Sequence, residues 1–250
     1  MSRPNEADCN TNQGWFSTTL WSQVFSAQTP DDTQGWKALE SLCERYWYPL
    51  YAFARQSGNN HEDARDLVQG FFEYILSRTF LAQADPNRGR FRSFLLGAFK
   101  HYISNQKVKQ RAQKRGNGKI HASLEDPGLN EKYLAEADIA SNPEYEFDRR
   151  WALNLLEGVM KELRSDWQSR GQKEAFERLK PFLLHGPGNG NETYASVASV
   201  MGITEAAFKM RVKRLREQYR TILHRTIADT VQDPSEISQE LTYLQKCLQG

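Results

Sequence analysis

The sequence YASVASVMGITEAAFKMRVKRLREQYR, residues 194–220, predicts two helices joined by a tight turn. Gly202 allows the turn, and Thr204 is a good N-cap for a second helix that continues to about Arg225. The residues expected to face the core recur every three or four positions and are Tyr194, Val197, Ala198, Met201, Phe208, Val212, Leu215 and Tyr219. This is the helix-turn-helix pattern.

The second helix of this pair is strongly basic. Residues 205–225 contain seven lysine and arginine residues and two acidic residues. Lys209, Met210, Lys213 and Arg214 project from a side that does not face the core, and that side would enter the major groove of DNA. Any short helical hairpin with a glycine matches the pattern, but the positive charge of the second helix favours the DNA-binding interpretation.

The net charge of the whole chain, +2, conceals a segregation of the two signs. Residues 88–119 contain ten basic residues and no acidic one, whereas residues 122–148 contain eight acidic residues and one lysine. A single charged block is often a solvated helix face. Two basic blocks on either side of an acidic segment that contains proline and glycine indicate two DNA-facing modules joined by a linker.

Further helices are predicted on both sides of the acidic segment. Upstream, apolar residues have helical spacing over 36–55, from Asn60 to about 76, and over 91–103; Pro49 should bend the first helix, and Asn60 with Asp63 should cap the second. Downstream, helices are predicted over 149–167 and 173–184, and the loop HGPGNGN, 185–191, breaks the chain. The residues DPSE, 233–236, open a last short helix, which we expect to dock on its own domain or, alternatively, to present a partner surface.

No segment alternates strictly enough to predict a strand, so the expected fold class is all-α. We expect two helical domains joined by an acidic linker, the second containing the helix-turn-helix. The expected parts are an N-terminal extension with one extra helix (1–35), a first domain (36–115), the acidic linker (116–147), a second domain (148–226) and a C-terminal extension (227–250).

The composition is that of an ordinary folded protein, with 39% hydrophobic and 26% charged residues among 250. Three scattered cysteines argue against a disulfide framework or a zinc site and indicate a reducing, cytoplasmic compartment. The longest uncharged stretch, 9–30, is interleaved with polar residues, so we expect no membrane span. The five histidines lack metal-ligand spacing and no catalytic motif is present, so we expect no enzyme, catalytic residue, metal or cofactor.

Four segments together resemble the extracytoplasmic-function (ECF) type of RNA polymerase sigma factors, in the sigma-70 family. They are ERYWYPLYAFARQSG (44–58), HEDARDLVQGFFEYIL (61–76), GRFRSFLLGAFKHYISNQ (89–106) and the stretch 194–220. Their order and spacing carry the resemblance, which covers roughly 36–115 and 150–225. The block RGRFRSFLLGAFKHY followed by RAQKRG (111–116) is similar to a divergent branch with longer terminal extensions.

The resemblance implies that the first domain, like sigma region 2, contacts core RNA polymerase and the promoter −10 element. The residues implied to contact the clamp of the polymerase β′ subunit are Asp63, Asp66, Gln69 and Glu73. Those implied to contact −10 DNA are Lys100, His101, Ser104, Asn105, Lys107 and Lys109. In this domain two residues depart from the family pattern: Gly70, where a glutamate is usual, and His101, where an asparagine is common.

The resemblance implies that the second domain, like sigma region 4, reads the −35 element. The implied residues are Lys209, Met210, Arg211, Lys213 and Arg214, with Arg211 or Arg216 on the DNA backbone. The acidic linker is similar to the family segment that lies in the RNA exit path, where negative charge imitates nucleic acid. The implied partners are core RNA polymerase, through its β′ clamp and β flap, promoter DNA and an anti-sigma factor.

The sequence therefore predicts a sigma factor that binds core RNA polymerase and directs promoter-specific transcription initiation. The alternative is a helix-turn-helix transcriptional regulator that acts without core polymerase. That alternative gives no reason for the polar surface around Asp66 and Gln69 or for the first basic block.

Overall fold

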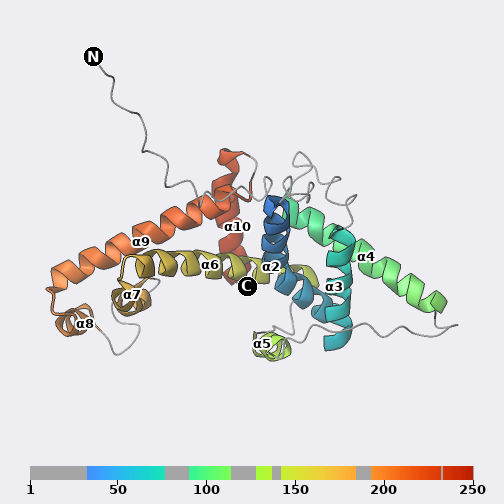
Figure 1. Ribbon diagram of the computed structural model, residues 1–250, viewed down its shortest axis with the longest axis horizontal. Helices are drawn as coiled ribbons and strands as arrows, with labels where there is room; N and C mark the ends of the chain where they lie inside the picture. The colour runs from blue at the N-terminus through green and yellow to red at the C-terminus, as the bar shows by residue number, and fades with distance from the viewer. Residues whose placement is uncertain are drawn as a thin grey trace, which may run out of the picture.

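The computed structural model describes residues 33–76, 90–113, 128–136, 142–183, 193–231 and 233–249. These residues form helices joined by turns and none lies in a strand, which confirms the all-α fold class (Figure 1). The predicted N-terminal helix falls almost entirely outside the described residues. The α-helices are α2 (Thr33–Gln56), α3 (His61–Leu76), α4 (Phe91–Gln113), α5 (Leu129–Glu136), α6 (Pro143–Ser169), α7 (Lys173–Leu179), α8 (Tyr194–Val200), α9 (Glu205–Ala228) and α10 (Ile237–Gln249).

Pro49 lies inside α2 and has no backbone N–H, so it cannot bond the carbonyl of Arg45 one turn earlier. The side chain of Asn154 on α6 donates a hydrogen bond to this carbonyl, with an Nδ2 to O distance of 3.3 Å. The ribbon of α2 changes direction about halfway along, as the proline predicts (Figure 1). The interruption of α2 thus provides a specific polar contact with α6.

The start of α3 is the one that its capping residue predicts. The Asn60 side-chain oxygen accepts a hydrogen bond from the Asp63 amide at 2.8 Å, and its Nδ2 donates to the Asp63 carboxylate at 2.9 Å. These bonds satisfy a free amide of the first turn and fix the helix phase. As a result Val68, Phe71 and Ile75 face the core.

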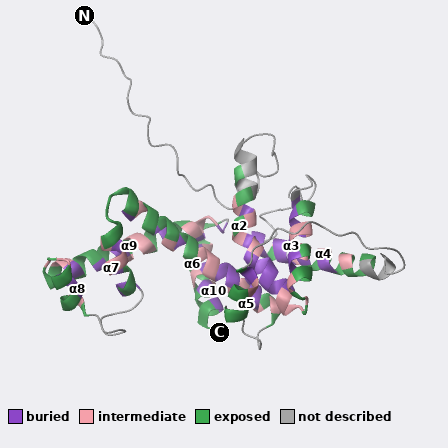
Figure 2. Ribbon diagram, turned by 60° about the horizontal axis from the view of Figure 1, so that its bottom comes forward, coloured by how far each residue is buried: buried purple, intermediate pink, exposed green. Residues whose placement is uncertain are grey.

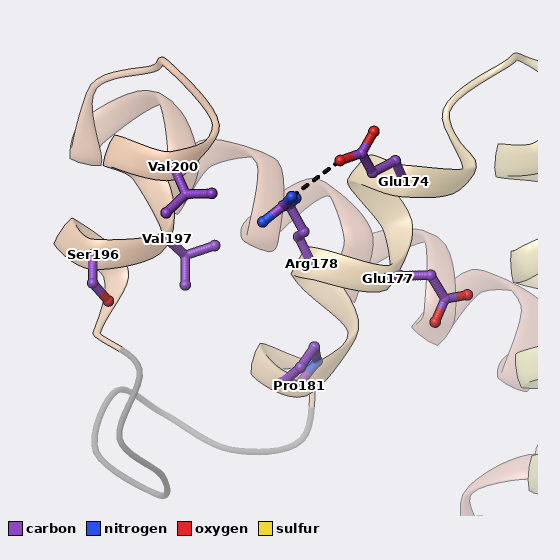
Figure 3. Close-up of a pocket in the computed structure, with 7 residues that line it drawn as sticks. All are labelled: Glu174, Glu177, Arg178, Pro181, Ser196, Val197 and Val200. Atoms are coloured by element: carbon purple, nitrogen blue, oxygen red, sulfur yellow. Dashed lines mark hydrogen bonds and ion pairs between the residues drawn. The ribbon is translucent and has the colours of Figure 1, made fainter.

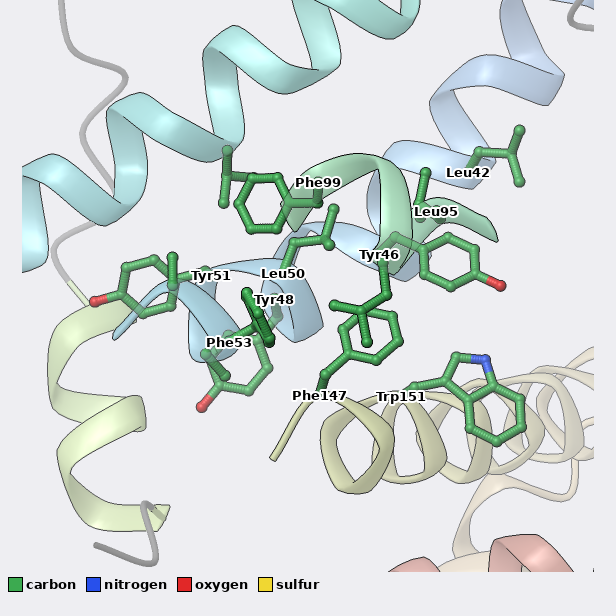
Figure 4. Packing of buried hydrophobic residues seen from close by; sticks show 14 of the residues in the cluster. Leu42, Tyr46, Tyr48, Leu50, Tyr51, Phe53, Leu95, Phe99, Phe147 and Trp151 are labelled. Atoms are coloured by element: carbon green, nitrogen blue, oxygen red, sulfur yellow. The ribbon is translucent and has the colours of Figure 1, made fainter. Parts of the chain in front are cut away.

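A first hydrophobic cluster lies where α2, α3, α4 and the beginning of α6 meet (Figures 2 and 4). Tyr46 and Leu50 of α2 are almost fully buried, and the rings of Phe71 on α3 and Phe99 on α4 lie 4.9 Å apart. Trp151 of α6 belongs to the same cluster. Rings with fixed packing partners make this cluster a rigid base for the outer faces of α3 and α4.

A second hydrophobic cluster joins the end of α6 to α7, α8 and α9. Its buried residues are Val159, Leu163, Trp167, Phe176, Leu179, Phe182, Leu183, Val197, Ala198, Phe208, Val212, Leu215 and Ile222. The long helices α6 and α9 pack against each other and extend between the two clusters (Figure 1). The clusters are therefore joined by two adjacent helices.

The segment predicted as the acidic linker (116–147) contains helical residues, and the predicted start of the second domain (148–226) lies inside a helix. Residues 129–136 form α5, whose Leu129 and Tyr133 are buried in the first cluster. Helix α6 begins at Pro143 after its cap Asn142 and continues through the predicted border. The reason is that Phe147, with none of its surface exposed, packs in the first cluster from the second turn of α6.

In two of the helices predicted in the C-terminal half of the chain, the structure replaces one end by a 3-10 turn. Helix α7 ends at Leu179, and a 3-10 turn, η3 (Lys180–Phe182), follows because Pro181 lacks the N–H that an α-helix needs. A 3-10 turn, η4 (Pro234–Glu236), likewise precedes α10. Helix α10 packs on α6 and α9, as expected for its own domain, but its buried residues join the first cluster, so the expected docking site was incomplete.

Candidate nucleic-acid interface

The first turn of α8 and the first turn of α9 are each capped by a threonine side chain. Thr193 and Ser196 form a capping box, with the Ser196 amide 3.1 Å from Thr193 Oγ1 and the Thr193 amide 2.9 Å from Ser196 Oγ. Gly202 has a φ of +64° in the turn, a conformation that glycine adopts without strain. Thr204 Oγ1 then accepts from the Ala207 amide at 3.2 Å. The predicted pair of helices and its turn are present, whereas its assignment as a DNA-binding helix-turn-helix stays a prediction.

The predicted −35 residues form the α9 basic surface, which we define as Lys209, Met210, Arg211, Lys213 and Arg214. All five side chains are exposed, and Met210 retains 51% of its surface. At about 100° per residue, four of them span an arc of about 140°, and Arg211 lies about 60° beyond it. The opposite side of α9 is buried through Phe208, whose ring lies 5.2 Å from that of Phe182.

The basic residues Lys209, Lys213 and Arg216 of α9 make two kinds of contact. Lys209 pairs with Glu205 at 2.7 Å and Lys213 with Glu217 at 3.9 Å, both across one exposed helical turn. Such exposed pairs are weak and can be exchanged for a phosphate contact. Arg216 instead donates to the carbonyl oxygens of Phe182 and Leu183, at 2.7 and 3.2 Å. Its guanidinium caps the chain after η3, which leaves Arg211 as the residue for the predicted backbone contact.

The predicted −10 residues form the α4 basic surface, which we define as Lys100, His101, Ser104, Asn105, Lys107 and Lys109. All six are exposed, on the half of α4 that extends away from the first cluster (Figure 1). Ile103 is the last buried residue along the part of α4 whose side chains are described. Within the described part of the chain no acidic side chain pairs with Lys107 or Lys109. At Lys107 and Lys109 this surface is therefore basic, and no described carboxylate neutralises it.

Lys100 differs from the other residues of the α4 basic surface. Its ammonium group lies 2.5 Å from a carboxylate oxygen of Glu144, in the first turn of α6. The hydrogen bond from Lys100 lowers the pKa of Glu144 below its ordinary value of 4.5. One end of the acidic segment thus lies on the edge of the α4 basic surface.

The first basic block also contains residues that do not face outward. Arg92 at the start of α4 is 4% exposed and forms ion pairs with Glu240 of α10 and, at 3.6 Å, with Asp148 of α6. Burial, together with the charge of Arg90, lowers the pKa of Arg92, and burial raises the pKa of Asp148. The structural role of Arg90 and Arg92 was missed by counting charge along the chain.

The predicted polymerase contact is the α3 acidic surface, which we define as Asp63, Asp66, Gln69 and Glu73. The three carboxylates are exposed, and Gln69 Nε2 lies 3.3 Å from Glu73 Oε1. Gly70 lies on another side, because a Cβ atom there would be 2.4 Å from the hydroxyl of Tyr102 on α4. The glutamate usual in the resembled family would not fit at this position without moving Tyr102.

A groove that the sequence did not predict separates α7 from α8 (Figure 3). It has a volume of about 530 Å³ and is lined by Glu174, Glu177, Arg178, Pro181, Ser196, Val197 and Val200. Val200 is 67% exposed, and Arg178 pairs with Glu174 at 3.0 Å on the rim. The groove thus has an apolar wall and two acidic side chains.

Within the described ranges, no three His, Cys, Asp or Glu side chains are grouped so that they could hold a metal ion. Nor does any described helix combine the length and apolar character needed to cross a membrane. Comparison of the chain with protein-family models, with curated proteins and with solved structures finds no match.

Proposed function

We propose that the chain is a sigma factor, which binds core RNA polymerase and directs it to promoters with a −10 and a −35 element. The observation that carries the proposal is the presence of two separate exposed basic surfaces, on α4 and α9, each supported by its own hydrophobic cluster. A regulator that binds one site through α8 and α9 would leave the α4 basic surface without a role.

The α9 basic surface has the chemistry for reading a major groove. Lysine and arginine side chains bind phosphates and the acceptor edge of guanine, and exposed Met210 can contact a thymine methyl group. The buried side of α9 and the two capped first turns keep the helix that carries these side chains in a fixed orientation.

The α4 basic surface has the chemistry for opened DNA. Lys107 and Lys109 can follow the phosphate backbone, while His101, Ser104 and Asn105 offer hydrogen-bonding groups to an unstacked base. Taking a base out of the duplex costs a few kcal/mol, which contacts of this kind can offset.

The remaining two features fit contacts with core polymerase. The α3 acidic surface projects from the rigid first cluster and would meet a basic surface of the β′ clamp. The groove between α7 and α8 would receive an apolar segment of the β flap, with Glu174 and Glu177 at its rim. Both contacts are part of the proposal.

Transcription in vitro with core polymerase and a promoter library tests the proposal. The protein should give promoter-specific transcripts, and Asp66→Ala should weaken binding to core polymerase without changing binding to an isolated −35 fragment. Glu131→Ala, which removes an exposed carboxylate from α5, is the matched control. If no specific transcript forms and the protein does not co-purify with core polymerase, the proposal fails. Tight promoter binding by the protein alone would support the regulator instead.

A further inference from the structure

Helix α10 is attached to the first cluster by both apolar and charged contacts. Ile237, Leu244 and Cys247 are buried on its inner side, and between them Glu240 has none of its surface exposed. The other side of the helix is mainly polar. Most of the apolar side of α10 is therefore used within the chain, and Leu248 near its end stays exposed.

The charged contacts of α10 reach the start of α4. Glu240 accepts hydrogen bonds from both terminal nitrogens of Arg92 and pairs with Arg90 at 3.0 Å. The Arg92 guanidinium lies between two aromatic rings, 4.2 Å from the centre of Trp151 on α6 and 4.6 Å from that of Tyr243 on α10. We call Arg90, Arg92, Glu240 and the two rings the latch.

A further hydrogen bond ties the latch to α6. The hydroxyl of Tyr243 donates to the carboxylate of Asp148, which also pairs with Arg92 at 3.6 Å. Apolar contacts alone tolerate small shifts of a helix along its neighbours, whereas this arrangement of charges is satisfied in one register only. The latch therefore fixes α10 to α4 and α6 in one position.

The latch connects the two basic surfaces through a second route besides α6. Helix α10 follows closely after α9, which carries one basic surface near its beginning, and it binds α4, which carries the other near its end. Both basic surfaces are exposed while α10 is docked. Release of α10 is thus not needed to uncover them, and the docked form can bind DNA.

We propose that the latch holds the α4 and α9 basic surfaces at one separation, so that the protein selects promoters with one spacer length between the −10 and −35 elements. This inference rests on the proposed function. One added base pair moves the two elements apart by about 3.4 Å and rotates them by about 35° relative to each other. A rigid protein cannot follow such a change without losing contacts at one element.

The first experiment measures the latch without reference to DNA. Cys247 of α10 is buried while that helix is docked, whereas Cys43 of α2 is partly exposed and serves as an internal reference. Removing the charge with Glu240→Gln leaves two arginines without their buried partner and should speed maleimide modification of Cys247 roughly a hundredfold, as expected for a lost buried pair. Glu236→Gln, on η4 beside α10, is the control and should leave the rate unchanged.

A second variant keeps the test valid if Glu240→Gln does not fold, which circular dichroism would reveal. Tyr243→Phe retains the ring over Arg92 and removes the hydroxyl, with its hydrogen bonds to Asp148 and to the Cys247 thiol, so it should give a smaller increase in Cys247 modification. Equal modification rates in the wild type and in both folded variants would overturn the latch.

The second experiment measures promoter choice with spacers varied one base pair at a time. The wild type should transcribe best from one spacer length. In Glu240→Gln the preference for that length over its neighbours should fall several-fold, but some preference should remain because α6 still joins the two clusters. Identical profiles in a variant whose Cys247 has become reactive would overturn the spacer inference alone. Absence of any specific transcript with the wild type would overturn the proposed function as well, so the two failures are distinguishable.

Discussion

Gly70 offers the sharpest test of how α3 and α4 fit together. Replacing it by alanine removes a glycine from a helix interior, which by itself stabilises a helix by about 1 kcal/mol. The new Cβ, however, would lie 2.4 Å from the hydroxyl of Tyr102, well inside any allowed contact. The ring of Tyr102 is confined by Phe71 and Tyr74, whose ring centres lie 5.6 and 5.9 Å away.

The magnitude follows from these opposing effects. Overpacking costs about 1 to 3 kcal/mol, so Gly70→Ala should destabilise the wild type by up to about 2 kcal/mol net. In a Tyr102→Phe background the oxygen is absent, and the next ring atom, Cζ, lies 3.6 Å away, an ordinary contact. There the same substitution should stabilise the protein by up to about 1 kcal/mol.

A double-mutant cycle measures this coupling. The free energies of unfolding of the wild type, both single variants and the double variant are obtained by urea denaturation followed by circular dichroism. We expect a coupling energy of about 1 to 3 kcal/mol between positions 70 and 102. An equal effect of Gly70→Ala in both backgrounds would refute the packing argument. An increase in stability on Gly70→Ala in the protein that retains Tyr102 would refute it as well.

Three further outcomes are expected. Thr204→Ala removes the cap on the Ala207 amide and should lower the stability of the second cluster by about 1 kcal/mol in thermal denaturation, whereas Thr204→Gly should cost only a few tenths. Arg214→Ala should reduce the slope of log affinity against log salt by about one in anisotropy measurements with a −35 fragment, if the side chain neutralises one phosphate. Lys100 lowers the folded-state pKa of Glu144, so the Glu144 carboxylate contributes to the stability of the fold above pH 4.5. This contribution is lost as the pH falls through the folded-state pKa. In Glu144→Gln, the loss of stability between these two pH values should therefore be smaller than in the wild type.

Local signals in the sequence predicted most of the helices and the beginnings of α3 and α9. Asn60 and Thr204 form the predicted caps because a capping bond involves only neighbouring residues. The bend at Pro49 follows from the same kind of local rule. Exposure of the two basic surfaces also agrees with the helical phase that their apolar residues set.

Features that depend on distant residues were not predicted. The extent of α6 depends on Phe147 finding a place in the first cluster, which the acidic composition around it conceals. Arg92 looks like any other basic residue of its block until Glu240, far along the chain, is placed beside it. The reason for Gly70 is likewise Tyr102, a residue on another helix.

The discontinuous make-up of the first cluster has a consequence for synthesis on the ribosome. Helices α2, α3 and α4 emerge early, but Phe147, Trp151 and the inner residues of α10 complete their packing. At ordinary translation rates this delay is on the order of ten seconds. During that interval the nascent chain carries an open aromatic surface, so its yield in cells should depend on chaperones that shield such surfaces until α10 has been made.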